Sequence, residues 1–192
     1  MAGSRREGKV ARGCVEDAQG EPRVIHCIDR HVTDADDADF EARSRSCTVL
    51  LSKAEPCAVM GVPQLLRSAV ENVVRNAVRY TTPGTAVEIT LQCELVDEKR
   101  TAVITVRDHG SGVPEEKLAA IFRPFYRVAD ARDRKTGGTG LGLAIASRAV
   151  RVHQGTISAL NAPGGGLIVE IRIPASFDQA RDPDVEPASP VL

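Results

Sequence analysis

Two asparagines, Asn72 and Asn76, stand four residues apart in the segment PQLLRSAVENVVRNAVRY. In a helix this spacing places them about 40° apart around the axis, so both side chains lie on one face. Asparagine is a weak helix former, so helix propensity does not explain why it occurs twice in the middle of this helix. Two neutral amide oxygens are suitable ligands for a Mg²⁺ ion that also binds substrate phosphates. One turn further along the helix, Arg79 could contact a phosphate and Tyr80 could lie against a base. A solvated polar face explains the same residues equally well.

A second candidate is Asp108 in VITVRDHGSGV, where a strand pattern ends and Gly110 and Gly112 follow. A carboxylate accepts the hydrogen bond that the exocyclic amine of adenine donates, so Asp108 could select adenine over guanine. The glycines would let the backbone approach a flat base closely. An aspartate–glycine turn after a strand is common, however, and the motif taken alone favours that interpretation.

The third candidate is the glycine run in RKTGGTGLGLAIASRAV, with four glycines in the six positions 137–142. It lacks the lysine of a P-loop, and Ile145 stands where a dinucleotide-binding motif has its third glycine. Backbone N–H groups exposed at the start of a helix form an anion site suited to phosphate. A flexible hinge, or a turn that lets a helix approach a sheet, would also explain this loop.

These motifs must be positioned by helices and strands, which the apolar spacing predicts. We expect a loose segment at 1–24, a domain over 25–175 and a disordered tail at 176–192. Within the domain, we expect helices at 25–42, 63–81, 114–122 and 141–152, and strands at 47–52, 86–95, 101–110 and, as a hairpin, within 155–174. Because strands follow one another without crossover helices, the pattern favours an α+β sandwich with a mixed sheet.

The composition suits one soluble globular domain: 192 residues, 42% hydrophobic and 27% charged. A net charge of −1 argues against a general nucleic-acid binder. Five scattered cysteines without a CxxC pair predict ordinary thiols in a reducing cytosol, not a disulfide framework or zinc site. We find no apolar run long enough for a membrane span and no signal peptide, which predicts a cytoplasmic chain.

Four segments, ENVVRNAVRYT, RDHGSGV, IFRPFYRV and GGTGLGLAIA, resemble in order the N, G1, F and G2 boxes of the sensor histidine kinase catalytic domain. That domain belongs to the gyrase, Hsp90, histidine kinase and MutL ATP-binding superfamily. The run RPFYRVADARDRKTGGTGLGLAIA is similar in particular to Cpx-type envelope-stress sensor kinases. The resemblance covers about residues 28–175. It implies the Bergerat-type fold, a two-layer α/β sandwich whose mixed, mostly antiparallel sheet packs on about three helices.

The resemblance also implies ATP and Mg²⁺ as cofactors. Asn76 and Asn72 would hold the metal, Arg79 would contact phosphate and Tyr80 would flank the adenine. Asp108 would bind the adenine amine in a pocket shaped by Gly110 and Gly112. Residues 127–137 would form a mobile lid anchored by Phe122 and Phe125. The remaining expected nucleotide contacts are Arg132, Arg134, Lys135, Gly138, Thr139, Gly140, Leu141 and Gly142.

Kinases of this family phosphorylate a histidine in a sequence resembling H-E-[LF]-R-x-P, and none of the four histidines here (26, 31, 109 and 153) fits it. The resemblance therefore implies a catalytic module, monomeric in isolation, that cannot phosphorylate itself. It would donate the γ-phosphoryl group to a separate dimerisation and acceptor domain, in the parent protein or in trans, with a response regulator downstream. The parent would be an inner-membrane sensor. Two alternatives stay open: a nucleotide-binding regulatory module without transfer activity, and an anti-sigma-type serine kinase.

The superfamily's ATPases carry a glutamate four residues before the metal asparagine, where it activates water. Here that position is Asn72. Glu71 is five residues from Asn76, about 140° around the helix, and should point elsewhere. The sequence therefore predicts slow ATP hydrolysis and a site built to retain the γ-phosphate for an external nucleophile.

Overall fold

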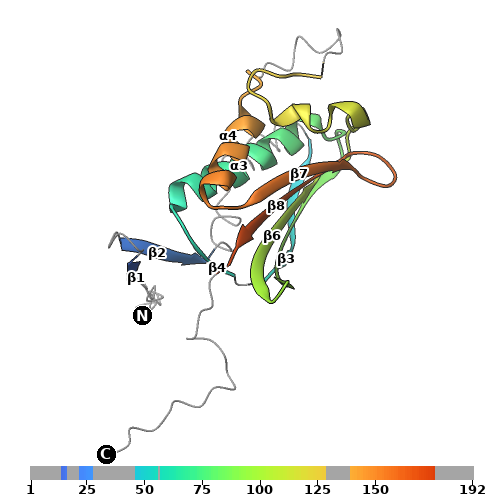
Figure 1. Ribbon diagram of the computed structural model, residues 1–192. Helices are drawn as coiled ribbons and strands as arrows, with labels where there is room; N and C mark the ends of the chain where they lie inside the picture. Colours follow the sequence, from blue (N-terminus) through green and yellow to red (C-terminus); the bar gives the residue numbers. More distant parts are fainter. Residues whose placement is uncertain (1–13, 17–21, 28–45, 56, 129–138, 176–192) are drawn as a thin grey trace, which may run out of the picture.

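A computed structural model describes residues 14–16, 22–27, 46–55, 57–128 and 139–175 of the chain (Figure 1). The strands are β1 (Cys14–Glu16), β2 (Pro22–Cys27), β3 (Thr48–Ala54), β4 (Ala58–Met60), β5 (Ala86–Val96), β6 (Lys99–Arg107), β7 (Thr156–Asn161) and β8 (Leu167–Pro174). The described α-helices are α3 (Pro63–Tyr80) and α4 (Gly142–Val152), and short 3-10 turns form at Glu115–Lys117 and Ala120–Phe122.

The main sheet has five strands in the order β3-β5-β6-β8-β7. Only β3 and β5 pair in parallel, whereas the other three pairings are antiparallel. The β5–β6 hairpin turns at Asp97 and Glu98, whose φ angles of 48° and 61° give the left-handed turn that matches the twist of a hairpin. The predicted mixed, mostly antiparallel sheet is thus confirmed. A smaller sheet has the order β1-β2-β4.

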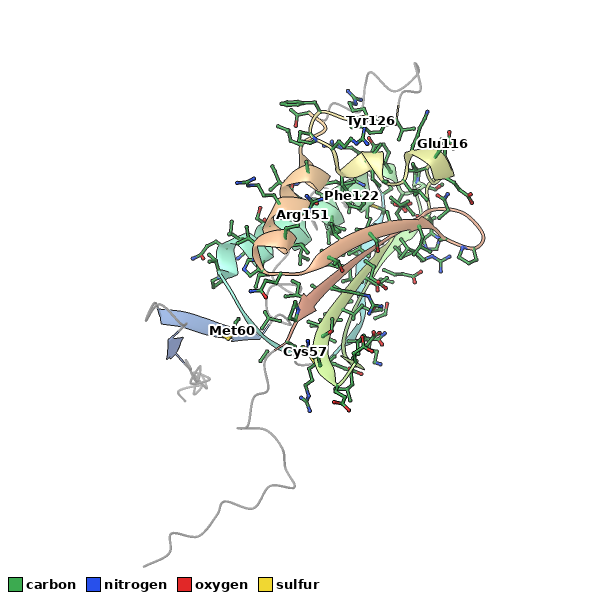
Figure 2. All side chains as sticks on the ribbon, viewed as in Figure 1. Cys57, Met60, Glu116, Phe122, Tyr126 and Arg151 are labelled. Carbon is green, nitrogen blue, oxygen red and sulfur yellow. A yellow bond between two sulfur atoms is a disulfide. The ribbon has the colours of Figure 1, made fainter. Side chains whose placement is uncertain are left out.

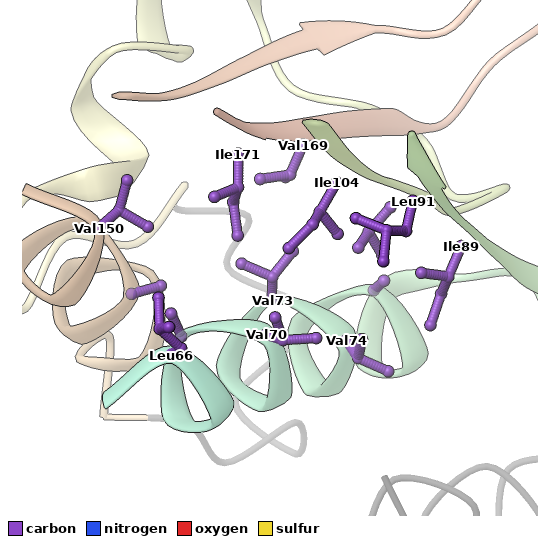
Figure 3. Packing of buried hydrophobic residues seen from close by; sticks show 14 of the residues in the cluster. Leu66, Val70, Val73, Val74, Ile89, Leu91, Ile104, Val150, Val169 and Ile171 are labelled. Carbon is purple, nitrogen blue, oxygen red and sulfur yellow. The ribbon is translucent and has the colours of Figure 1, made fainter. Parts of the chain in front are cut away.

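Helices α3 and α4 lie side by side on one face of the main sheet (Figure 1). In Figure 3, Val73 of α3 points toward the sheet, where Ile104 and Ile171 lie. Val70 and Val74 of the same helix belong to the same buried cluster. All five side chains are buried. Removing this apolar surface from water stabilises the two layers by roughly 25 cal/mol per Å². The resulting core holds α3 rigidly against β5 and β6, which fixes the polar face of the helix.

Both ends of α3 have local causes. Pro63 occupies the first turn, where its missing N–H costs no hydrogen bond, and the Val62 carbonyl accepts the N–H groups of Leu65 and Leu66. The helix ends before Thr82 because Pro83 follows, and the residue that precedes a proline is restricted to extended conformations. The chain then turns through Gly84, at φ 84°, into β5.

Three predictions about local structure need correction. Residues 25–27 were expected to begin a helix but belong to β2, which pairs antiparallel with β4, and β1 lies in the segment expected to be loose. Pairing with distant strands outweighs the helical spacing there. The expected helix at 114–122 is instead the two 3-10 turns. Residues 28–45 and the expected tail at 176–192 lie outside the described residues.

The prediction that all cysteines are free thiols is also wrong. Cys57 and Cys93 form a disulfide with their Cα atoms 5.6 Å apart, whereas Cys47 is free and buried. The pair joins the residue just before β4 to β5 across 36 residues of sequence, so no local spacing could reveal it. Among the described helices, none is long and apolar enough to cross a membrane.

Candidate functional site

A cavity of about 810 Å³ lies between α3, the start of α4, the loop after β6 and the β7–β8 turn. Residues from all three sequence motifs line it. They are Asn72, Asn76, Arg79, Tyr80, Asp108, Gly112, Thr139, Gly140 and Gly142. The fold therefore brings together motifs that are up to 70 residues apart in sequence.

The two asparagines present their amides differently. Asn72 Nδ2 donates to the Ser68 carbonyl at 2.8 Å and to Ser68 Oγ at 3.3 Å, which leaves Oδ1 facing the start of α4. A Cβ placed on Gly142 would lie 3.1 Å from this Oδ1, so the two elements approach closely. The Asn76 side chain makes no hydrogen bond to any residue that the structure describes.

This pair fits a hard cation that is held jointly with a ligand's phosphates. Mg²⁺ prefers oxygen and is usually bound by few protein groups together with phosphates and water. The described ranges contain no cluster of three or more histidine, cysteine, aspartate or glutamate side chains that could hold a metal alone. A metal here would depend on the Asn72 and Asn76 oxygens and on the ligand.

Asp108 is 3% exposed and is oriented by backbone groups. Its Oδ1 accepts hydrogen bonds from Gly110 N at 2.8 Å and from Leu167 N at 3.1 Å. Within the described ranges, Oδ2 accepts none and keeps its lone pairs for a ligand. Burial raises the pKa of Asp108 above its usual value, and the two N–H groups oppose that rise. The site thus offers a fixed acceptor in a poorly hydrated pocket.

The loop after Asp108 is tied to the end of α3. His109 N donates to Thr81 Oγ1 at 3.1 Å, and Thr82 Oγ1 donates to His109 O at 2.6 Å. The His109 ring contacts Glu88 Oε1 through Nε2 at 3.0 Å. A Cβ on Gly110 would collide with the Tyr80 carbonyl, which explains glycine at this position. Gly110 shapes the loop in this way, although it does not line the cavity.

The glycine run opens α4 at the other end of the cavity. Gly142 is the first residue of α4, and no side chain caps the helix, so its first N–H groups can bind an anion. Gly140 has φ 71° and its carbonyl accepts from Phe125 N at 2.9 Å. A Cβ there would lie 2.9 Å from the Tyr126 carbonyl. The hydrogen bond between Phe125 and Gly140 therefore joins two residues that flank the expected lid at 127–137.

The cavity is basic although the whole chain is nearly neutral. Its described lining includes Arg75, Arg79, Lys117 and Arg127 but only one acidic residue, Asp108. Basic side chains around a concave surface attract polyanions. The charge distribution therefore favours a ligand with several phosphates and one hydrogen-bond donor directed at Asp108.

Other predicted residues lie differently. Phe122 packs partly buried against the core. Phe125 is 74% exposed at φ 62°, so it contacts Gly140, beyond the expected lid, through its backbone N–H and not through its ring. Figure 2 labels Phe122 and Tyr126 in the upper part of the domain, and the turn that contains Phe122 contacts α4. Neither phenylalanine nor Leu141 lines the cavity. Arg132, Arg134, Lys135 and Gly138 lie outside the described residues.

Several lining residues were missed by sequence reasoning. Lys117 carries no pattern that distinguishes it from an ordinary surface residue. Tyr126 belongs to the segment IFRPFYRV, but the sequence assigned it no role of its own. Asn161 is the last residue of β7 and contacts Val113. The only feature of the sequence that could have indicated a role for it is its position shortly before a glycine run. A Cβ on Gly166 would collide with the Asp108 carbonyl, so the β7–β8 turn lies directly against the aspartate.

Two further observations bear on the chemistry. Glu71 Oε1 pairs with Arg67 Nε at 2.7 Å on α3 and does not line the cavity, as its helical position predicts. His153 is buried: it contacts Ala149 O through Nδ1 at 2.7 Å and accepts from Val62 N through Nε2 at 2.9 Å. Its Nδ1 thus bonds within α4, and its Nε2 joins the end of α4 to Val62 before α3, so both nitrogens are occupied.

Comparison with known proteins identifies similar chains. Residues 61–176 match the family described as histidine kinase-, DNA gyrase B-, and HSP90-like ATPase. The sensor histidine kinase CpxA of Escherichia coli strain K12 is 45% identical over 141 residues, 72% of this chain and 29% of CpxA. The sensor-like histidine kinase SenX3 of Mycobacterium tuberculosis is 32% identical over 191 residues, 95% of this chain and 44% of SenX3.

Among solved structures, the ATP binding domain of PrrB from Mycobacterium tuberculosis superposes with a TM-score of 0.60 and 28% identity. The match covers 80% of this chain and 98% of that domain. This agreement confirms the predicted sandwich. The chain spans less than half the length of CpxA and SenX3, the curated relatives named above.

Proposed function

Because this chain belongs to the histidine kinase-, DNA gyrase B- and HSP90-like ATPase family, we propose that it binds ATP with Mg²⁺ and donates the γ-phosphoryl group to a histidine on a separate acceptor domain in two-component signalling. One observation carries the proposal: a single basic cavity is lined by the asparagine pair, the oriented aspartate and the glycine loop that begins α4.

The adenine end rests on Asp108. The carboxylate accepts the exocyclic amine of adenine, whereas guanine presents a carbonyl at that position and would meet electrostatic repulsion. Tyr80, 47% exposed at the cavity, flanks the base. The neighbouring Gly112 leaves room for a flat ring.

The phosphate end rests on the N-terminus of α4 and on the basic residues. N–H groups of the first turn and the guanidinium of Arg79 neutralise phosphate charge. When bound, Mg²⁺ would be held by Asn72 and Asn76 and would offset charge on the transferring phosphate. Arg132, Arg134 and Lys135, outside the described residues, are expected to supply further contacts.

The transfer itself forms a bond between an acceptor imidazole nitrogen and the γ-phosphorus. The bond from the γ-phosphorus to the bridging oxygen breaks, ADP leaves with the electron pair, and the imidazole proton passes to solvent. Among the described lining residues the only carboxylate is Asp108, which is committed to the base. No glutamate of the described lining is placed to activate water, so the site favours transfer over hydrolysis.

The acceptor must come from outside this sequence. His109 and His153 are engaged with Glu88 and Val62, and neither His26 nor His31 lies in an acceptor motif. We therefore place this module, monomeric in isolation, beside a dimerisation and acceptor domain, with a response regulator downstream. We propose that the module acts in the cytoplasm, where ATP is supplied, as the catalytic part of a membrane sensor.

The test is to mix the chain with γ-labelled ATP, Mg²⁺ and a purified histidine-containing acceptor hairpin from a CpxA-like kinase. We expect label on the hairpin that is lost in acid and kept in alkali, as for a phosphoramidate. A hairpin whose histidine is replaced by alanine serves as the control. Acid-stable label would indicate a serine kinase, and nucleotide binding without label would indicate a regulatory module; either result contradicts the proposal.

A further inference from the structure

The side chain of Asn161, the last residue of β7, pairs with the backbone of Val113, 48 residues earlier. Its Oδ1 accepts from Val113 N at 2.9 Å, and its Nδ2 donates to Val113 O at 2.7 Å. One amide thereby satisfies the donor and the acceptor of one backbone residue, as an adjacent strand would. Both residues line the cavity.

Val113 closes the loop that begins at Asp108. The first half of the loop is held by Asp108 N donating to Leu167 O and by the threonines that bond His109. In the second half, residues 111–113, the Asn161 amide makes the only backbone hydrogen bonds that involve described residues. The two halves are thus fixed independently.

Gly112 shows how closely the loop rests on this amide. A Cβ on Gly112 would lie 2.6 Å from Asn161 Oδ1, and its φ of 72° is a conformation suited to glycine. Any change that displaces the amide therefore also displaces Gly112 and Val113. Both belong to the wall of the cavity.

We propose that Asn161 is a positioning residue for nucleotide binding, which holds the Gly112–Val113 wall in the shape that accepts the base bound to Asp108. The inference rests on the proposed function. Asn161 need not touch the nucleotide, because it acts through Val113.

Two substitutions separate positioning from general support of the fold. Asn161→Ala removes both hydrogen bonds. Asn161→Asp keeps them while the new carboxyl is neutral, since its carbonyl accepts from Val113 N and its O–H donates to Val113 O. Once ionised, the carboxylate has no donor and repels Val113 O. Donation to Val113 O favours the neutral form, so the pKa of the new carboxyl should lie above its ordinary value of about 3.9.

The assay is calorimetric titration with ADP from about pH 4.5 to about pH 8, a range that spans the ionisation of the new carboxyl. Each variant's Kd is divided by that of the wild type, because Asp108 and the ADP phosphates also titrate. Ser158→Ala, on an exposed position of the same strand, is the matched control. Thermal unfolding curves establish that each variant is folded at the assay temperature.

We expect Asn161→Ala to weaken ADP binding about tenfold throughout, equivalent to about 1.4 kcal/mol. The Asn161→Asp ratio should approach one at the acidic end and rise to the alanine value at the alkaline end. Ser158→Ala should match the wild type. Binding within twofold of the wild type for both Asn161 variants, or an Asn161→Asp ratio that does not change with pH, would overturn the inference. If the wild type failed to bind ADP, the proposed function would fail and this inference with it.

Discussion

Replacing Asp108 by asparagine separates nucleotide recognition from folding. The new side chain has the same shape as the old one, and its amide oxygen can still accept from Gly110 N and Leu167 N, the two donors that hold Oδ1 at 2.8 and 3.1 Å. Its NH₂ group then takes the place of Oδ2. A donor would face the adenine amine, which is also a donor, so the hydrogen bond to the base is lost.

The magnitude follows from the kind of bond removed. A hydrogen bond to a charged group contributes about 1.5–3 kcal/mol, which corresponds to a roughly 10- to 150-fold increase in Kd for ATP.

The stability of the folded state should respond differently from ATP affinity. Burial raises the pKa of Asp108, so this group stabilises the folded state below its unfolded-state pKa and loses that contribution as the pH rises through its folded-state pKa.

At neutral pH the ionised carboxylate therefore disfavours folding, and Asp108→Asn should leave the free energy of unfolding of the ligand-free protein unchanged or higher. The assay pairs ATP titration calorimetry with urea denaturation. Asp97→Asn, in the exposed β5–β6 turn, changes the same chemical group at the opposite end of β6 from the site and should alter neither quantity. ATP affinity that survives Asp108→Asn would refute the placement of the base.

Three further predictions concern other parts of the molecule. Asn76→Ala should abolish the Mg²⁺-dependent part of ATP affinity, measured with and without EDTA, while α3 stays folded because alanine favours helix; equal Mg²⁺ dependence in the variant would contradict the metal assignment. Steady-state ATP hydrolysis by the chain alone, measured as phosphate release, should be slow, because Asn72 stands where the superfamily's ATPases have the glutamate that activates water. Hydrolysis as fast as transfer to an acceptor would contradict this inference. Reducing the Cys57–Cys93 disulfide should lower the free energy of unfolding by roughly 3–4 kcal/mol for a loop of this length, with Cys93→Ser insensitive to reductant. ATP affinity should not change on reduction, because Cys57 lies at the opposite end of the domain from Tyr126 at the cavity (Figure 2).

The sequence allowed the site to be predicted where local spacing determines geometry. Asn72 and Asn76 share a face because the helix period puts them there, and the apolar residues of α3 point the opposite face into the core. Asp108 follows a strand whose alternation is plain. These features depend on residues within a few turns of one another, so periodicity is enough to find them.

Features set by distant parts of the chain could not be predicted in this way. Asn161 is an ordinary strand end until the fold brings Val113 beside it. The Cys57–Cys93 pair depends on the register of β5 against the chain before β4. The segment at Ile25 has apolar residues at helical spacing, and its strand is determined by a partner more than 30 residues away.

The most direct test of the central claim is a crystal structure of the chain with a non-hydrolysable ATP analogue and Mg²⁺. We predict the adenine amine within hydrogen-bond distance of the Asp108 carboxylate, the phosphates at the first turn of α4, and the metal between them and the Asn72 and Asn76 oxygens. A nucleotide bound outside this cavity, or bound with its base at α4 and its phosphates at Asp108, would contradict the account.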